Sequence, residues 1–423
     1  MRVFYGWWVL GGLFLMYAVS NGISTFTLPI FYSSFVDEFG WSYREVTQPA
    51  AIKFLFAAIY NLSVGFLLDR YSPRPIMAAG ALVMVVGLVS FLYMDSLWHF
   101  TAIYLLIAFG LSMCGLVPSM LTVSRWFTKY RGRAVGILLM ASSLGGAVLP
   151  KIIQTPMSEG DWRTAMMILA GIGFFGMFLP VLWPVRGRPE DKDTTPDGLP
   201  LEEAQALGTA DKQIGIFGGA PLGQVARMPV FYYLLVATGV LWFCITGVTQ
   251  HHALFLEKDA GYSRSDVIDV VFVFFLCAII GKFSFGWLSD HVNRLLVMFL
   301  AAANLGIGLI ILRLVDGESV TMTYAYAVVF GIGFSGTFTM IQLTIAELFA
   351  GPTYGRILGV YVAVDTISAS AGIFSLGVMR DALGSYYRSF ELMIFLVVVA
   401  LACVWAIKKA ADARDVAQPV AAE

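Results

Sequence analysis

Apolar runs of about 20 residues recur along the whole of this 423-residue chain. Each run is long enough to cross ~30 Å of hydrocarbon as an α-helix. Only 13% of the residues are charged and the mean hydropathy is +0.78, which leaves too little polar surface for a soluble core of this size. A membrane β-barrel would instead show alternating strands of about ten residues. The sequence therefore predicts an all-α membrane protein that crosses the bilayer many times.

The apolar runs predict about twelve transmembrane helices, in two sets of six. A polar stretch rich in Gly, Pro, Asp and Glu separates the two sets, as is typical of a linker. We expect a bundle over 1–184, a cytoplasmic linker over 185–227, a second bundle over 228–410 and a tail over 411–423. The expected spans are 7–30, 46–68, 75–93, 100–124, 134–153, 165–183, 230–256, 267–288, 295–314, 323–348, 355–379 and 392–407.

Lysine and arginine residues concentrate in the loops on one side of the expected membrane, and the opposite loops carry mostly acids. The positive-inside rule places the basic loops, both termini and the linker in the cytoplasm. Residues 1–6 lead directly into the first span without a small-residue cleavage site, so no cleavable signal peptide is expected.

The two sets of spans are related to each other by a shift of about 221 residues. Residues 65–74, read GFLLDRYSPR, then align with 286–294, read GWLSDHVNR, and the Phe-Gly pair at 109–110 aligns with the same pair at 330–331. The order and common offset of these matches predict two parallel six-helix pseudo-repeats around a central cavity. Transporters built in this way bind substrate between the halves near the middle of the membrane.

The stretch at 65–74 resembles the loop motif of the major facilitator superfamily, and the resemblance covers nearly the whole chain. The opening at 5–8, read YGWW, the run at 126–136, read WFTKYRGRAVG, and the loop of the second half are similar to the monocarboxylate and oxalate/formate transporter family. The resemblance implies a transporter of small organic anions. A monocarboxylate and proton symport are expected.

The two repeated loops are expected to act as cytoplasmic gates, one in each half. Asp69 and Asp290 lie at the ends of the second and eighth spans, where a carboxylate can bind the start of a neighbouring helix and pair with an arginine. The glycines would allow close helix approach. The alternative is that these charges only fix the topology. The predicted gating residues are Gly65, Asp69, Arg70, Arg74, Arg133, Gly286, Asp290, Arg294 and Arg356.

Lys282 lies inside the eighth span, where an ionisable residue is costly unless it faces a cavity or a partner. In the resembled family an arginine at this place in a GRxxxG motif binds the substrate carboxylate, whereas this chain reads GKFSFG at 281–286. Lysine offers a point charge and not a planar fork, so recognition would be less directional. The resemblance implies that Lys282 binds substrate. The alternative is a lysine that snorkels to the inner surface.

Asp365 lies well inside the eleventh span, with Tyr361 one turn before it on the same face. Asp365 could neutralise Lys282 in the empty protein, or it could carry a proton. The alternative is a protonated carboxyl that makes a helix–helix hydrogen bond. The acidic residue that the family has one turn before its arginine is replaced by Ala278 here, so Asp365 is the substitute candidate for proton coupling, with Tyr361 beside it for substrate binding.

His251 and His252 lie late in the seventh span. The sequence around His252 resembles a His-Leu-Val stretch of the family whose histidine faces the substrate, and histidine titrates near neutral pH. The resemblance implies that His252 binds substrate and carries a proton. The alternative is a buried neutral histidine bonded to a backbone carbonyl. Two adjacent histidines without a spaced third ligand predict no metal site.

Two polar residues of the first two spans are further candidates. Lys53, in the outer part of the second span, could attract anions from outside or snorkel outward. Asn21, midway along the first span, could bind substrate or make a helix–helix hydrogen bond. The family's first-span lysine is missing, and Thr25 aligns with its place.

The chain contains no HExxH, no GxSxG and no paired-carboxylate set, so we expect neither an enzyme nor a cofactor. The net charge of −1 indicates no nucleic-acid partner. We predict a monomeric transporter of a bacterial inner membrane that moves a small organic anion with protons by alternating access. Anion exchange, transport of another solute such as a sugar or drug, and a sensor built on a transporter scaffold remain alternatives.

Overall fold

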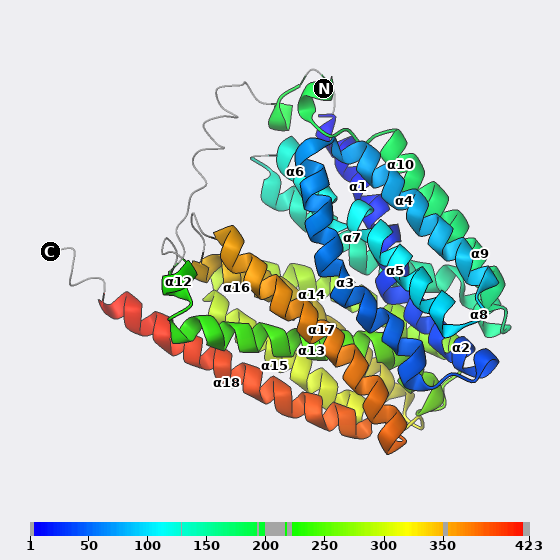
Figure 1. The fold of residues 1–423 in the computed structure, drawn as a ribbon. Coiled ribbons are helices and arrows are strands. Elements are labelled where there is room, and N and C mark those ends of the chain that lie inside the picture. Colours follow the sequence, from blue (N-terminus) through cyan, green and yellow to red (C-terminus); the bar gives the residue numbers. More distant parts are fainter. Residues whose placement is uncertain are drawn as a thin grey trace. The chain divides into compact units, whose positions relative to one another are not determined.

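The computed structural model is all-helical in the part of the chain that it describes, which confirms the expected fold class (Figure 1). The described residues are 4–127, 129–192, 194–198, 216–217, 222–349 and 354–417. The chain divides into two compact units. Unit 1 consists of Met1–Asp211, Leu256–Lys258 and Tyr262–Phe272, and unit 2 consists of Lys212–Phe255, Asp259–Gly261 and Val273–Glu423.

The first half of the chain forms the helices coloured blue to cyan-green in Figure 1. They are α1 (Gly6–Asn21), a π-helix (Gly22–Thr27), a 3₁₀-helix (Leu28–Phe31), α2 (Tyr32–Phe39), α3 (Tyr43–Arg70), α4 (Pro73–Ser90), a 3₁₀-turn (Phe91–Tyr93), α5 (Leu97–Cys114), α6 (Leu116–Trp126), α7 (Arg131–Ile152), α8 (Gln154–Ser158), α9 (Trp162–Gly173), a π-helix (Phe174–Phe178) and α10 (Leu179–Leu182).

The second half of the chain forms longer and more regular helices. They are α12 (Leu222–Val225), α13 (Pro229–Lys258), α14 (Arg264–His291), α15 (Arg294–Arg313), α16 (Val320–Phe349), α17 (Tyr354–Leu383) and α18 (Tyr387–Ala417). Within unit 2, α15 packs against both α16 and α18. Parts of the linker are also described: Pro189–Lys192 and Pro196–Gly198 form 3₁₀-turns.

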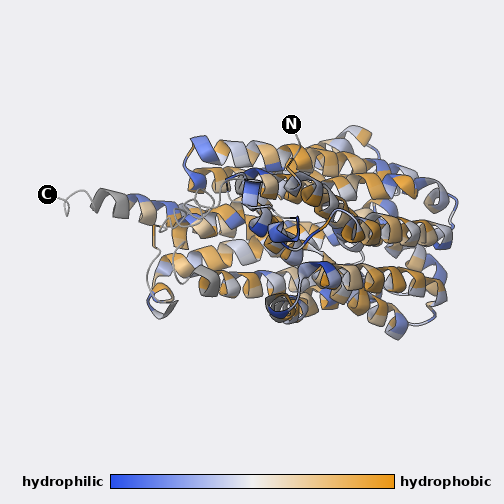
Figure 2. Cartoon of the chain, turned by 90° about the horizontal axis from the view of Figure 1, so that it is seen from above, coloured by the Kyte–Doolittle hydropathy of each residue, from blue (hydrophilic) through white to orange (hydrophobic). Residues whose placement is uncertain are grey.

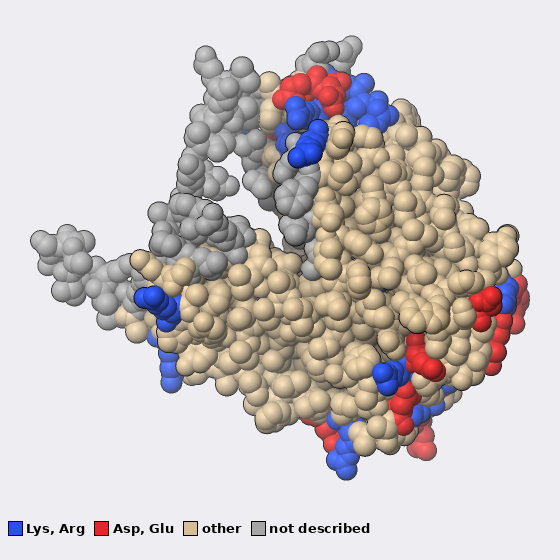
Figure 3. Space-filling view, in the orientation of Figure 1, with Lys and Arg blue, Asp and Glu red and all other residues tan. Residues whose placement is uncertain are grey.

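Eleven helical segments within the described residues are long and apolar enough to cross a membrane. Helix α3 is not among them, but its 28 residues span about 42 Å, which is also sufficient for a crossing. Together these agree with about twelve transmembrane helices. Hydrophobic residues predominate along the helices and hydrophilic ones gather at their ends (Figure 2). In each unit the charged side chains likewise gather at helix ends, and a broad uncharged surface lies between them (Figure 3).

The turn before α3 shows how local sequence sets helix bounds. Gly40 adopts a left-handed conformation (φ 67°) and ends α2. Ser42 then forms a capping box with Glu45: its side-chain oxygen accepts from the Glu45 N–H at 3.2 Å, and the Glu45 carboxylate accepts from the Ser42 N–H at 2.8 Å. These bonds satisfy backbone donors that the first helical turn leaves without partners.

Glycines allow the helices of unit 1 to touch through their backbones. A Cβ atom added to Gly145 of α7 would lie 1.9 Å from the carbonyl oxygen of Ala18 in α1, and Gly22 would meet the Gly145 backbone at 2.8 Å. Gly80 of α4 and Gly110 of α5 approach each other in the same way. A Cβ atom added to either glycine would lie 2.8 Å from the carbonyl oxygen of the other. Such contacts are typical of membrane helices, whose association depends on close packing.

Candidate functional site

Lys53 of α3 is buried inside unit 1, with only 3% of its surface exposed. Its ammonium nitrogen donates to the backbone oxygen of Ser24 at 2.6 Å and lies 3.4 Å from the hydroxyl of the same residue. The side chain therefore points into the helix bundle and does not extend to the surface.

The partner of Lys53 lies where the first span departs from an α-helix. Gly22–Thr27 is a π-helix, and the N–H of Leu28 after it bonds to the oxygen of Ile23 five residues back. Such turns are often found at functional sites because they displace carbonyl groups from the regular ladder. Gly22 also makes the close backbone contact with Gly145. The packing of α1 against α7 thus fixes the segment that carries Ser24.

Two aromatic rings complete the surroundings of the Lys53 ammonium. It lies 5.2 Å from the ring centre of Phe54 and 5.9 Å from that of Tyr104 in α5, within the range of cation–π attraction. The Tyr104 hydroxyl donates to the hydroxyl of Tyr32 at 3.2 Å. Within the described residues, no carboxylate forms an ion pair with Lys53. A buried cation of this kind can accept an external anion.

Lys282 of α14 is half-buried in unit 2. Its ammonium lies 5.6 Å from the ring centre of Phe338 in α16, and Phe338 in turn contacts the ring of Trp242 in α13, with 5.6 Å between centres. Gly281 makes this placement possible, since a Cβ atom there would lie 2.5 Å from the carbonyl oxygen of Ile332 in α16. The indole N–H of Trp242 is buried and has no hydrogen-bond partner in the described part of the chain.

Asp365 of α17 is 5% exposed. Its carboxylate lies near the side chain of Thr238 in α13, and its Oδ1 atom has no hydrogen-bond partner among the described residues. The two helices are close here, because a Cβ atom on Gly239 would lie 3.0 Å from the hydroxyl of Ser368. In the described structure Asp365 makes no ion pair with Lys282.

Tyr361 is fully buried one turn before Asp365. Its hydroxyl donates to the backbone oxygen of Phe231 at 2.8 Å, and its ring packs against Phe231 and Phe349. In this conformation the hydroxyl joins α17 to the start of α13 and is already engaged.

The two histidines of α13 differ in how their ring nitrogens are used. His251 lies 2.9 Å from the carbonyl oxygen of Ile373 through Nε2 and 2.8 Å from the hydroxyl of Tyr386 through Nδ1. Because the carbonyl must accept, Nε2 carries the proton and both nitrogens are engaged. His252 bonds through Nδ1 to the hydroxyl of Tyr326 at 2.9 Å. Its Nε2 has no hydrogen bond within the described residues, so this nitrogen is available to a ligand.

Asn21 is half-buried and is the last residue of α1 before the π-helix. Its amide side chain makes no hydrogen bond with any other described residue. It therefore keeps both of the roles expected from the sequence.

Only some of the expected gating residues have side chains that the structure describes. The side chains of Gly65, Asp69 and Arg356 lie outside the described residues. Arg74 is engaged inside unit 1, where its guanidinium donates to the carbonyl oxygens of Val181 (3.2 Å) and Leu182 at the end of α10. This arginine stabilises a helix end.

The other gating residues are placed without the expected pairs. Arg133 is exposed and lies 5.7 Å over the ring of Tyr130. A Cβ atom on Gly286 would meet nothing within 4 Å in the part of the chain that the structure describes. Within the described residues, no ion pair involves Arg70, Asp290 or Arg294.

Ion pairs at helix ends are the feature that sequence reasoning missed. In unit 2, Arg380 donates to Asp259 Oδ1 from Nε (2.9 Å) and Nη2 (2.8 Å), and Asp259 Oδ2 accepts from the N–H of Tyr386. The side chains are 15% and 5% exposed. In unit 1, Asp37 of α2 pairs with Lys258 and, at 2.9 Å, with Arg264. These residues fall in expected loops, where the sequence does not reveal which loops meet.

A family model described as the Major Facilitator Superfamily matches residues 13–373 and 253–419. The chain is similar to the uncharacterized MFS-type transporter YcxA of Bacillus subtilis, with 25% identity over 390 residues and 90% of each chain covered. It is also similar to monocarboxylate transporter 13 of Rattus norvegicus, with 22% identity over 397 residues, covering 91% of this chain and 85% of that one.

Among solved structures, the chain resembles a bacterial homolog of the human lysosomal transporter Spinster in an inward-facing and unoccupied conformation. The TM-score is 0.73 at 17% sequence identity, with 98% of this chain and 99% of that chain covered. This likeness establishes the fold.

Proposed function

Because this chain belongs to the Major Facilitator Superfamily and is a membrane transporter and not an enzyme, we propose that it moves a small organic anion by alternating access. The proposed substrate is a monocarboxylate, carried with protons across the inner membrane of a bacterium. The similarity to a monocarboxylate transporter supports this substrate class.

The observation that carries the proposal is the burial of Lys53 without an anionic partner in the described part of the chain. A buried charge is costly, and the cost is relieved when a carboxylate binds it. Lys282 supplies a second ammonium inside unit 2, beside Phe338. We propose that Lys282 and the free Nε2 of His252 contribute to anion binding in unit 2, and that Lys53 and the amide of Asn21 contribute to anion binding in unit 1.

For proton coupling we propose Asp365, with His252 as the second carrier. The Oδ1 atom of Asp365 is buried without a hydrogen-bond partner among the described residues, which is supportive because such an oxygen gains most from binding a proton. Tyr361 holds the backbone of α17 against α13 close to this carboxyl. For gating we propose that Asp290 pairs with an arginine of its own loop or with Arg356 when the cytoplasmic side is closed.

The decisive measurement is uptake of labelled lactate, pyruvate, formate and acetate into proteoliposomes at several pH values. Lys53→Gln and Lys282→Gln each remove one charge-assisted contact, so uptake should fall by about tenfold to a hundredfold. Lys409→Gln is the matched control, since Lys409 is exposed near the end of α18. Wild-type uptake in both site variants would show that neither lysine binds the anion. If the wild type binds these anions without taking them up, the result would favour a sensor. If it takes up sugars and none of the anions, the proposed substrate class would be wrong.

Proton coupling has its own test. Asp365→Asn should lose uphill accumulation driven by a pH gradient and keep counterflow exchange, because the amide cannot carry the proton but leaves the anion site intact. Thr238→Ala is the control, since it removes the hydroxyl group beside Asp365 and retains the carboxyl. Undiminished pH-driven accumulation by Asp365→Asn would reject the role.

A further inference from the structure

A second cationic site lies at one end of unit 1, where α6 ends and the chain leaves α10. A pocket of about 440 Å³ is present there, which is large enough for a small charged group. It is lined by Arg125, Arg188, Pro189, Glu190 and Asp191. No expected site residue lies in this pocket.

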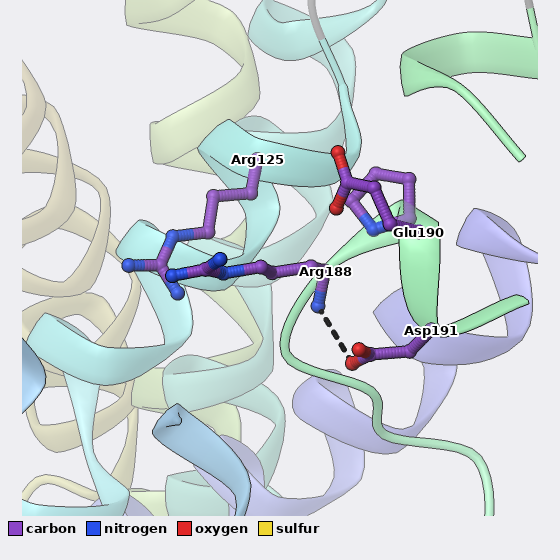
Figure 4. Close-up of a pocket in the computed structure, with 5 residues that line it drawn as sticks. Arg125, Arg188, Glu190 and Asp191 are labelled. Atoms are coloured by element: carbon purple, nitrogen blue, oxygen red, sulfur yellow. Dashed lines mark hydrogen bonds between the residues drawn. The ribbon is translucent and has the colours of Figure 1, made fainter. Parts of the chain in front are cut away.

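Two guanidinium groups define the pocket. Both arginines line the pocket, and in Figure 4 their guanidinium groups overlap in the view. The Nη1 atom of Arg125 is buried and has no hydrogen-bond partner in the described structure. No described residue forms an ion pair with either arginine. Two neighbouring cations repel each other, and an anion between them would relieve the repulsion.

The two acids of the pocket do not occupy that position. The carboxylate of Asp191 accepts a hydrogen bond from the backbone N–H of Arg188 at 3.1 Å and so faces the other side of the loop. In Figure 4 the carboxylate of Glu190 lies apart from the tips of the guanidinium groups. The opening in front of the arginines is therefore available to a ligand.

The pocket is built on a loop that is fixed at several points. The indole N–H of Trp126 donates to the backbone oxygen of Arg186 at 2.9 Å. A Cβ atom on Gly187 would lie 2.6 Å from the hydroxyl of Ser72, so the loop passes directly over the start of α4. Arg74 binds the carbonyl groups at the end of α10. The backbone that carries Arg188 is thus held in place before any ligand arrives, which reduces the entropy lost on binding.

The level of the pocket relative to the membrane indicates which anion it meets. Trp183, at the end of the sixth span, is 81% exposed. Exposed tryptophans at the ends of spans lie at the height of the lipid headgroups, and Arg188 follows five residues later. Positive-inside topology places this end on the cytoplasmic side, where anionic phospholipids attract arginine-rich sites. The planar forks of two arginines suit a phosphate group.

We propose that Arg125 and Arg188 form a phosphate-binding site that takes either the headgroup of an anionic phospholipid or free phosphate. The site lies within unit 1 and is independent of the proposed transport of a monocarboxylate.

The test measures phosphatidylglycerol bound to the purified full-length protein by native mass spectrometry, with phosphatidylcholine as the uncharged comparison. Arg125→Gln/Arg188→Gln should weaken phosphatidylglycerol binding by about tenfold or more. Arg227→Gln should bind like the wild type, since it removes an exposed arginine on the same expected side of the membrane. Arg188→Gln alone, at an exposed residue, gives a second variant that does not depend on the burial of Arg125.

Competition distinguishes the two sources of the phosphate group. Binding of phosphatidylglycerol that resists millimolar inorganic phosphate assigns the site to lipid. Displacement by inorganic phosphate, with a rise in the melting temperature in phosphatidylcholine, assigns it to the free anion. Equal retention of phosphatidylglycerol by the wild type, the double variant and Arg188→Gln would overturn the proposal.

Discussion

The contact between α1 and α7 permits a sharp test of how the π-helix is held. A methyl group added at Gly145 would lie 1.9 Å from the oxygen and 2.8 Å from the carbonyl carbon of Ala18, and 3.1 Å from the Cα of Gly22. All three are backbone atoms, which cannot turn aside as a side chain does. Ordinary contact requires that α1 retreat by more than ~1 Å.

We predict that Gly145→Ala lowers the free energy of unfolding by about 1–3 kcal/mol through this overpacking. The higher helix propensity of alanine offsets up to about 1 kcal/mol of the loss. Anion uptake should fall as well, because displacement of Gly22 moves the Ser24 carbonyl that binds Lys53.

The measurement is thermal unfolding in detergent together with uptake into proteoliposomes. Gly11→Ala is the matched control: it lies in α1 and a Cβ atom there meets nothing within 4 Å, so it should stabilise by about 0.5–1 kcal/mol. The reasoning would be refuted if the melting temperature of Gly145→Ala equalled or exceeded that of Gly11→Ala and its anion uptake were normal.

Three further predictions concern stability. Asp259→Ala removes a buried carboxylate that accepts hydrogen bonds from Arg380 and from the N–H of Tyr386, and it should lower the free energy of unfolding by about 3 kcal/mol, seen as a lower midpoint in thermal scans. Ser42→Ala removes the capping box and should cost about 1 kcal/mol, with faster hydrogen exchange confined to the first turn of α3. Tyr326→Phe removes the hydrogen bond to His252 and should cost about 1–3 kcal/mol, whereas an unchanged melting curve would show that the bond contributes nothing.

The fold class followed from the sequence because an apolar run in a membrane can satisfy its backbone only as a helix or a closed barrel. The expected span at 46–68 is close to the observed helix Tyr43–Arg70 for that reason. The break of the first span at Gly22 was not predicted, since nothing in residues 22–27 marks a π-helix. The backbone of this segment packs against Gly145, more than a hundred residues away in the chain.

The candidate site was predictable only in its residue types. The sequence identified Lys53 as a costly charge but left its direction open, because an apolar helix has no polar face to indicate which side turns inward. The expected neutralisation of Lys282 by Asp365 required knowing that α14 and α17 present these residues to each other. In the described structure Asp365 instead lies near Thr238, and Lys282 lies against Phe338. Contacts between distant helices set both outcomes.

The π-helical turn of the first span also gives α1 an adjustable winding. Such a turn holds one residue more than its α-helical counterpart, and one residue corresponds to about 100° of rotation. If residues 22–27 rewound into an α-helix, Asn21 would swing to another side of the bundle, and the carbonyl of Ser24 would leave the Lys53 ammonium. The hydrogen bond from Lys53 to the Ser24 carbonyl therefore favours the π-helical form of the first span.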